Sequence, residues 1–107
     1  MKLILAVVQN DDSSAVNSTL NDNGFMVTKL ATTGGFLRSG NTTFIICTDD
    51  DRVNQVIELI KRDSCRRKEV VPTTVAFDIN QYSAYPVEIT VGGATIMVLN
   101  VEQFVKV

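Results

Sequence analysis

The chain has 107 residues, 45% of them hydrophobic, with 10 lysines and arginines against 12 aspartates and glutamates and a net charge of −2. This length predicts a single domain over residues 1–107 with a modest core. The weakly acidic balance argues against polymeric nucleic acid and anionic membranes as partners, since both favour basic proteins. No apolar run approaches the roughly 20 residues that span a bilayer, and the N-terminal run lacks a signal-peptide cleavage pattern. We therefore expect a cytoplasmic protein.

The first half of the sequence predicts one helix among three strands. Residues 2–9 are a continuous apolar run of strand length. Residues 11–14 supply an N-cap for a helix that ends at Asn23-Gly24, a typical left-handed stop. Residues 25–31 alternate between apolar and polar side chains and predict a second strand, and residues 42–48 predict a third.

The second half predicts a further helix and two more strands. Apolar residues at helical spacing define an amphipathic helix that ends near Cys65. These residues are Val53, Val56, Ile57 and Ile60. Residues 87–91 and 94–99 flank Gly92-Gly93, which is a strong signal for a two-residue β-hairpin. Residues 101–107 predict a short closing turn and tail.

Residues 66–85 show no helical period over about 20 positions. A structureless segment of that length in a compact domain is usually functional or mobile. Its basic start at Arg66 and the aromatic residues Phe77 and Tyr82 favour a long mobile loop with a function. The alternative is a solvated linker.

The order β-α-β-β-α-β-β predicts an α+β, ferredoxin-like fold, with an antiparallel sheet and two helices on one face. Two helices of about 12 residues each protect only one face of such a sheet. Strands as apolar as these favour burial of the other face in an oligomer.

No residue set in the sequence suggests catalysis or a metal site. Histidine is absent, which removes the commonest general base and metal ligand, and no nucleophile has a base beside it. The acids at 49–51 offer oxygen ligands for a magnesium ion, but acids directly before a helix more often cap it. Cys47 lies in an apolar strand pattern, as in reduced intracellular proteins. Cys65, beside basic residues, is either a thiol sensor or, more commonly for a lone thiol, without such a role. We expect no enzyme activity and no cofactor.

The segment from Thr28 to Thr43 is rich in threonine and glycine and has the apolar pair Phe36-Leu37 at its centre. Gly34-Gly35 permits positive φ and close approach to backbone N–H groups, and short hydroxyl and amide side chains donate to phosphate oxygens. A phenylalanine in such a loop is typical of a surface on which a nucleobase stacks. The alternative, a simple hairpin loop, leaves the apolar pair unexplained. Residues 33–41 therefore predict a glycine-rich ligand loop.

With Met1–Gln9 before this segment and Val91–Leu99 after it, the chain resembles the PII-like cyclic-di-AMP receptors over nearly its whole length. The resemblance implies a homotrimeric, ferredoxin-like signal-transduction protein that binds one cyclic dinucleotide at each subunit interface. It implies that ligand binding rearranges the loops and so changes a surface offered to a protein target, whose identity stays open.

The resemblance also implies which residues contact the ligand. The matching positions are Thr28, Gly35, Phe36, Leu37 and Asn41. Thr28 and Asn41 would hydrogen-bond a base edge or a phosphate, and the backbone around Gly35 would donate N–H groups to an anion. Phe36 and Leu37 would cover an adenine face.

Five positions depart from the family's usual pattern. Gly24 and Met26 stand where members commonly have Asn and Arg, and Cys47 replaces a small Gly. Met97 replaces an aromatic that stacks on the ligand, and Lys106 replaces Gln or a similar residue. Losing one Arg hydrogen bond to a ligand costs about 1.5–3 kcal/mol, which Lys106 offsets in part if it pairs with a phosphate. We count all of these except Gly24 among the candidate ligand residues.

Two other functions stay open. One is a divergent PII-like regulator that recognises another nucleotide or acts through protein contacts alone. The other is a small ferredoxin-like enzyme, which rests on fold analogy only. Binding of a nucleotide panel separates the first from a cyclic-di-AMP receptor, and turnover of the bound nucleotide would support the second.

Overall fold

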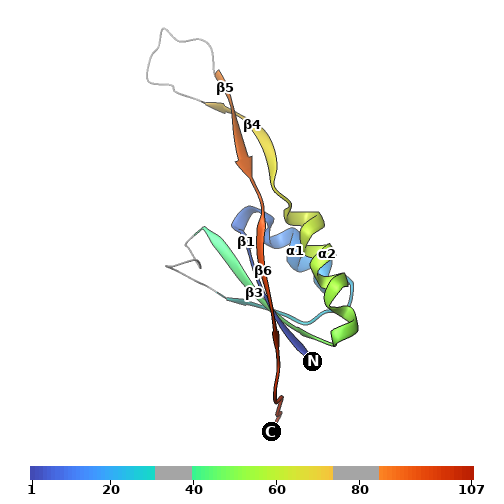
Figure 1. Cartoon of the computed structure of the whole chain (residues 1–107). Coiled ribbons are helices and arrows are strands. Elements are labelled where there is room, and N and C mark those ends of the chain that lie inside the picture. Colours follow the sequence, from blue (N-terminus) through green and yellow to red (C-terminus); the bar gives the residue numbers. More distant parts are fainter. Residues whose placement is uncertain (31–39, 74–84) are drawn as a thin grey trace.

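The structure, a computed structural model, describes residues 1–30, 40–73 and 85–107. The elements are β1 (Lys2–Gln9), α1 (Asn10–Asp22), β2 (Val27–Leu30), β3 (Asn41–Thr48), the 3-10 helix η1 (Asp50–Arg52), α2 (Val53–Ser64), β4 (Arg67–Thr73), β5 (Tyr85–Val91) and β6 (Ala94–Asn100). Four strands form the main sheet, and β4 and β5 form a separate two-stranded ladder, which we call the arm. Figure 1 shows both helices on one side of the sheet and the arm extending away from it, in line with β6.

The main sheet has the strand order β2-β3-β1-β6, and every neighbouring pair is antiparallel. Strand β1 pairs with β3 from Lys2↔Thr48 to Gln9↔Asn41 and with β6 from Lys2↔Asn100 to Val8↔Ala94. A connection through each helix that skips over one strand is the split βαβ arrangement of ferredoxin-like folds. The predicted α+β, ferredoxin-like fold with two helices on one face is confirmed.

The core lies between the sheet and the two helices. Alternate residues of β1, namely Ile4, Ala6 and Val8, point toward the helices and are at most 1% exposed. The buried hydrophobic residues that meet them include Val16 and Leu20 of α1, Phe44 and Ile46 of β3, and Val56 and Ile60 of α2. The amphipathic pattern predicted for the second helix thus covers the sheet, and truncating one of these large residues to alanine would cost about 2–5 kcal/mol.

The opposite face of the sheet is apolar and carries no helix of the described residues (Figure 1). Directly paired residues of neighbouring strands present their side chains on the same face. On this face, which we call the open face, lie Leu3, Leu5, Ile45, Cys47, Met97 and Leu99. The leucines of β1 are only half-buried, and Leu99 is 45% exposed. Two helices therefore leave a large apolar surface uncovered within one chain.

Helix α1 starts earlier in the sequence than predicted, although it ends where predicted. Helix α1 begins at Asn10, before residues 11–14, and Gln9 in the N-cap position makes no side-chain capping bond. Residues 11–14 are themselves helical, so they contribute acidic charge to the first turn rather than a cap. The predicted stop at Asn23-Gly24 is correct, with Gly24 at φ +84°.

The three acids before α2 do not cap it, contrary to the prediction. Neither η1 nor α2 has a side-chain capping bond at its N-terminus. The carboxylate of Asp50 instead lies 3.1 Å from the N-terminal ammonium of Met1. The hydrogen bond from this ammonium lowers the pKa of the Asp50 carboxyl below its ordinary value. The start of β1 is thereby attached to the segment that precedes α2.

The predicted hairpin at Gly92-Gly93 is wrong. Strand β5 pairs with β4 and strand β6 with β1, so the two glycines join the arm to the main sheet. Both have positive φ, +84° and +95°, and an added Cβ on Gly92 would lie 2.5 Å from the carbonyl oxygen of Cys65. Glycine is required here because the backbone turns close to the end of α2, where the N–H of Gly93 donates to the carbonyl oxygen of Ser64.

The long loop predicted over residues 66–85 is partly replaced by strands. Arg67–Thr73 pairs with Tyr85–Val91 in a continuous antiparallel register. The β-branched residues of this segment favour a strand, but its partner lies beyond the intervening residues, so no local pattern shows the pairing. Residues 74–84 lie outside the described part of the chain.

Candidate functional site

Four of the predicted ligand residues line one cavity of about 510 Å³. They are Met26, Thr28, Cys47 and Lys106, and we call this space the Cys47 cavity. It lies at the end of the sheet where β1 starts and β3 finishes, because Met1 and Thr48 also line it.

The elements that form the Cys47 cavity come from both ends of the chain. Thr28 of β2 pairs with Ile45 of β3, and Cys47 follows two residues later on the same face. Met26, just before β2, is 86% exposed. Lys106 arrives on the C-terminal tail after Val101, whose N–H donates to the carbonyl oxygen of the first residue, 3.3 Å away. These residues lie far apart in the sequence, so the sequence alone does not show that they line one cavity.

The Cys47 cavity also contains residues that the sequence analysis missed. Arg52 stands over the ring of Phe25 at 4.1 Å from its centroid, and Phe104 of the tail adds a second aromatic side chain. Two cationic side chains, Arg52 and Lys106, accompany one carboxylate, that of Asp49. The cavity therefore combines apolar surface with an excess of positive charge. In the sequence, Arg52 directly follows three acids. That pattern indicates the start of a helix and does not point to a ligand-binding residue.

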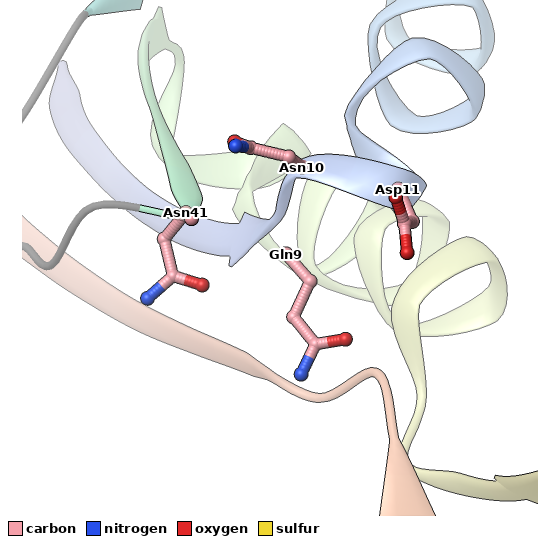
Figure 2. A pocket seen from close by; sticks show the side chains of 5 residues that line it. Gln9, Asn10, Asp11 and Asn41 are labelled. Carbon is pink, nitrogen blue, oxygen red and sulfur yellow. The ribbon is translucent and has the colours of Figure 1, made fainter. Parts of the chain in front are cut away.

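Asn41 lies at the other end of the sheet, in a cavity of about 320 Å³. We call it the Asn41 cavity; its lining is Gln9, Asn10, Asp11, Gly40 and Asn41. Gln9 and Asn41 are direct cross-strand partners, and Figure 2 shows their amide side chains extending in the same direction. The N–H of Asn10 donates to the carbonyl oxygen of Gly40 at 3.0 Å, which closes the start of α1 against the start of β3.

A second hollow of about 230 Å³ adjoins the same two amides. Gln9 and Asn41 line it together with Arg66, Gly92 and Gly93. The side-chain oxygen of Gln9 accepts a hydrogen bond from the N–H of Gly92 at 2.8 Å. This space, the junction cavity, is therefore bordered both by a predicted ligand residue and by the link between arm and sheet.

The structure does not bring all nine predicted ligand residues together within one chain. Thr28 lies level with Ile45, and Asn41 is four residues away along β3, about 13 Å at the rise of a strand. Met97 lies level with Leu5 on the far side of β1, outside the residues that line the Cys47 cavity. Gly35, Phe36 and Leu37 lie outside the described residues, as does most of the predicted loop 33–41.

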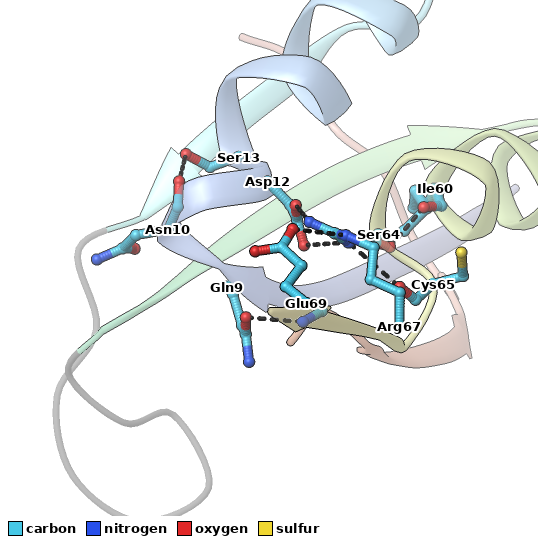
Figure 3. A network of polar contacts seen from close by, with 10 residues as sticks. Gln9, Asn10, Asp12, Ser13, Ile60, Ser64, Cys65, Arg67 and Glu69 are labelled. Carbon is cyan, nitrogen blue, oxygen red and sulfur yellow. Dashed lines mark hydrogen bonds and ion pairs between the residues drawn. The ribbon is translucent and has the colours of Figure 1, made fainter. Parts of the chain in front are cut away.

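A polar network holds the arm against the body (Figure 3). The carboxylate of Asp12, 6% exposed, accepts hydrogen bonds from Arg67 at 2.8 and 3.5 Å. The Arg67 guanidinium also lies 3.4 Å from Glu69 and donates to the carbonyl oxygen of Cys65 at 3.2 Å. The hydrogen bond to Asp12 raises the pKa of the Arg67 guanidinium. The base of β4 is thus fixed to the first turn of α1.

The part of the chain that the structure describes contains neither a cluster of metal ligands nor a helix that could span a membrane. No group of three or more histidine, cysteine, aspartate or glutamate residues is placed to hold a metal ion there. Among those same residues, no helix is long and apolar enough to cross a membrane. Cys47 and Cys65 are free thiols with exposed side chains.

The split βαβ sheet with two helices on one face defines a small ferredoxin-like protein, and a cationic and partly apolar cavity lies at one end of that sheet. Comparison of the sequence with known families is more specific. The profile of the family described as cyclic-di-AMP receptor matches residues 1–107. The chain therefore belongs to the cyclic-di-AMP receptor family, which confirms the resemblance seen in its sequence.

A solved structure agrees with this assignment. The chain is similar to the crystal structure of a functionally unknown protein from Pediococcus pentosaceus, with 42% sequence identity and a TM-score of 0.80. The similarity covers 99% of this chain and 96% of that one. The fold described above therefore occurs in a second protein.

Proposed function

We propose that this protein is a signal-transduction receptor that binds cyclic di-AMP between the subunits of a homotrimer and passes the signal to a protein target through loop rearrangement. The observation that carries the proposal is the family match over all 107 residues. The receptor needs no catalytic group, and we propose none.

A site between subunits is supported by the separation of its parts. Thr28 and Cys47 lie near one end of the sheet and Asn41 near the other, so they serve one ligand most simply if neighbouring subunits each contribute an end. The open face supports the same arrangement. Its half-buried Leu3 and Leu5 would be covered by further copies of the chain, and burial of apolar area is the main driving force for association.

Within this proposal the roles of the ligand residues follow their chemistry. The hydroxyl of Thr28 and the amide of Asn41 hydrogen-bond a base edge or a phosphate, and the ammonium of Lys106 pairs with a phosphate. Phe36 and Leu37 cover an adenine face. Met26, Cys47 and Met97 contribute apolar contact in place of the side chains that the family commonly has there.

The signal would leave the site through the junction cavity. Gln9 borders both the Asn41 cavity and the junction cavity, and its side chain binds Gly92. A ligand that contacts Asn41 differently in two arm positions would shift the balance between them, because only differential contacts can shift an equilibrium. The arm and the residues 74–84 beyond it would then present a changed surface to the target.

One observation favours the alternative of a divergent regulator with another nucleotide ligand. Four of the five departures from the family pattern line the same cavity, namely Gly24, Met26, Cys47 and Lys106. A protein discriminates between ligands by the contacts it makes with one and the clashes or unpaired charges it presents to another, and side chains of changed size and charge in one cavity alter both. A different base or a different phosphate position would then suit this cavity better.

Calorimetry and sedimentation equilibrium on the purified protein test the proposal. We expect a trimer that binds cyclic di-AMP in preference to cyclic di-GMP, ATP and AMP. Preference for another of these nucleotides would support the divergent regulator, and binding of none would favour action through protein contacts alone. A monomer of 11.7 kDa at micromolar concentration would rule out the intersubunit site.

A further inference from the structure

We propose that Arg52 is an anion-binding residue of the Cys47 cavity and that its guanidinium holds a phosphate of the bound nucleotide. The identity of the nucleotide rests on the proposed function. The cation itself and its placement are independent of it. Arg52 is the last residue of η1, between β3 and α2, and lies outside the glycine-rich segment.

The guanidinium of Arg52 is held in place before any ligand arrives. It lies 4.1 Å from the ring centroid of Phe25 and donates to the carbonyl oxygen of Asn23 at 3.1 Å. Phe25 is itself fixed, since it is 4% exposed and its N–H donates to the carbonyl oxygen of Leu20 at 3.0 Å. A planar cation stacked on a buried ring loses little further freedom on binding, which favours affinity.

The charge of Arg52 is not neutralised by the described part of the protein. The ion pairs found there involve the N-terminal ammonium, Arg62, Arg67 and Lys68, and none involves Arg52 or Lys106. Asp49 lines the same cavity, but its carboxylate forms no ion pair with Arg52. The two residues are joined through their backbones, where the N–H of Arg52 donates to the carbonyl oxygen of Asp49 at 3.0 Å. Among the described residues, the cavity is thus lined by two cationic side chains without an ion pair and by one carboxylate.

The chemistry around Arg52 selects a phosphate-bearing ligand with a planar group. A guanidinium has five N–H donors, of which the carbonyl oxygen of Asn23 takes one, so the remaining edge can donate two parallel bonds to phosphate oxygens. Met26 brings no charge to the cavity, and Phe104 supplies an aromatic surface for a base. A neutral nucleoside would leave both Arg52 and Lys106 without a partner.

The test uses three variants of the purified full-length protein. Arg52→Gln removes the charge, and Arg52→Lys keeps the charge but removes the planar fork that stacks on Phe25. Arg62→Gln is the matched control, because the Arg62 side chain is 64% exposed and pairs with the adjacent Asp63 at 3.7 Å. Binding of cyclic di-AMP to each protein is measured by calorimetry at low and at high salt. In a second experiment, inorganic pyrophosphate is titrated into the wild type while the side-chain Nε–H signals of Arg52 and Arg62 are followed by NMR.

Arg52→Gln should weaken cyclic di-AMP binding about 10- to 100-fold and make the remaining affinity less dependent on salt, which a merely structural role would not do. Arg52→Lys should lie between Arg52→Gln and the wild type, and Arg62→Gln should bind within about twofold of the wild type. Equal affinity of Arg52→Gln and the wild type, or an unchanged salt dependence, overturns the inference.

The pyrophosphate experiment decides the matter if the wild type does not bind cyclic di-AMP at all. That result alone would overturn the proposed function. A saturable shift of the Arg52 signal, with the Arg62 signal unmoved, would then still support an anion site at Arg52. No shift, or equal shifts of both signals, would overturn it.

Discussion

The side-chain oxygen of Gln9 accepts a 2.8 Å hydrogen bond from the backbone N–H of Gly92. Gln9 ends β1 and is the cross-strand partner of Asn41, whereas Gly92 is the first residue after β5. One amide side chain therefore touches both a candidate ligand cavity and the base of the arm. This contact is a direct physical link between the two.

Gln9→Met should uncouple the arm from the ligand without abolishing binding, because methionine keeps the length of the side chain but replaces the amide oxygen that accepts from the N–H of Gly92 with a sulfur that is only a weak acceptor. We expect cyclic di-AMP affinity to change by less than about tenfold, since one neutral hydrogen bond contributes about 0.5–1.5 kcal/mol. Amide hydrogen exchange of residues 66–85 should change with ligand in the wild type and change much less in Gln9→Met.

Gln55→Met is the control for that substitution, because Gln55 is exposed on α2. It should behave as the wild type does. Equal exchange of residues 66–85 with and without ligand in the wild type would mean that the signal leaves by another route, such as the predicted loop 33–41.

Gly92→Ala should destabilise the fold more than Gly93→Ala does. Both positions have positive φ, +84° and +95°, so each alanine incurs the left-handed cost of about 1–2 kcal/mol. A Cβ on Gly92 would additionally lie 2.5 Å from the carbonyl oxygen of Cys65, while one on Gly93 meets nothing within 4 Å. Denaturant unfolding of both variants measures the difference, and equal losses would show that the junction relaxes freely.

Asn41→Ala should weaken cyclic di-AMP binding by about 1–3 kcal/mol, because it removes an amide that would satisfy a base edge or a phosphate. Calorimetry measures the loss. Asn54→Ala, at an exposed position of α2, is the matched control and should leave the affinity unchanged. Full affinity of Asn41→Ala would remove this residue from the site.

The double variant Met26→Arg and Cys47→Gly should bind cyclic di-AMP more tightly than the wild type. It adds a cation and removes a side chain in the Cys47 cavity, which both residues line, and a charged hydrogen bond contributes about 1.5–3 kcal/mol. Competition binding against the wild type measures the gain. Unchanged or weaker binding would indicate a cavity adapted to another ligand, and the divergent regulator would then be favoured.

The sequence by itself determined what depends on local pattern. The apolar run of β1, the helical spacing from Val53 to Ile60 and the stop at Asn23-Gly24 each follow from the periodicity or backbone preference of adjacent residues. The resemblance to the family was visible in continuous segments such as Thr28–Thr43, and the family match over residues 1–107 confirms it.

Only the tertiary structure decided how segments far apart in the chain meet. The pairing of β4 with β5, the turn at Gly92-Gly93 between two sheets and the lining of one cavity by both Lys106 and Met26 all depend on non-local contacts. Such contacts reflect which strand edge is available and what the helices already cover, and neither is encoded in neighbouring residues. For the same reason the placement of Arg52 over Phe25 could not be predicted: it requires the end of α1 and the start of α2 to lie side by side.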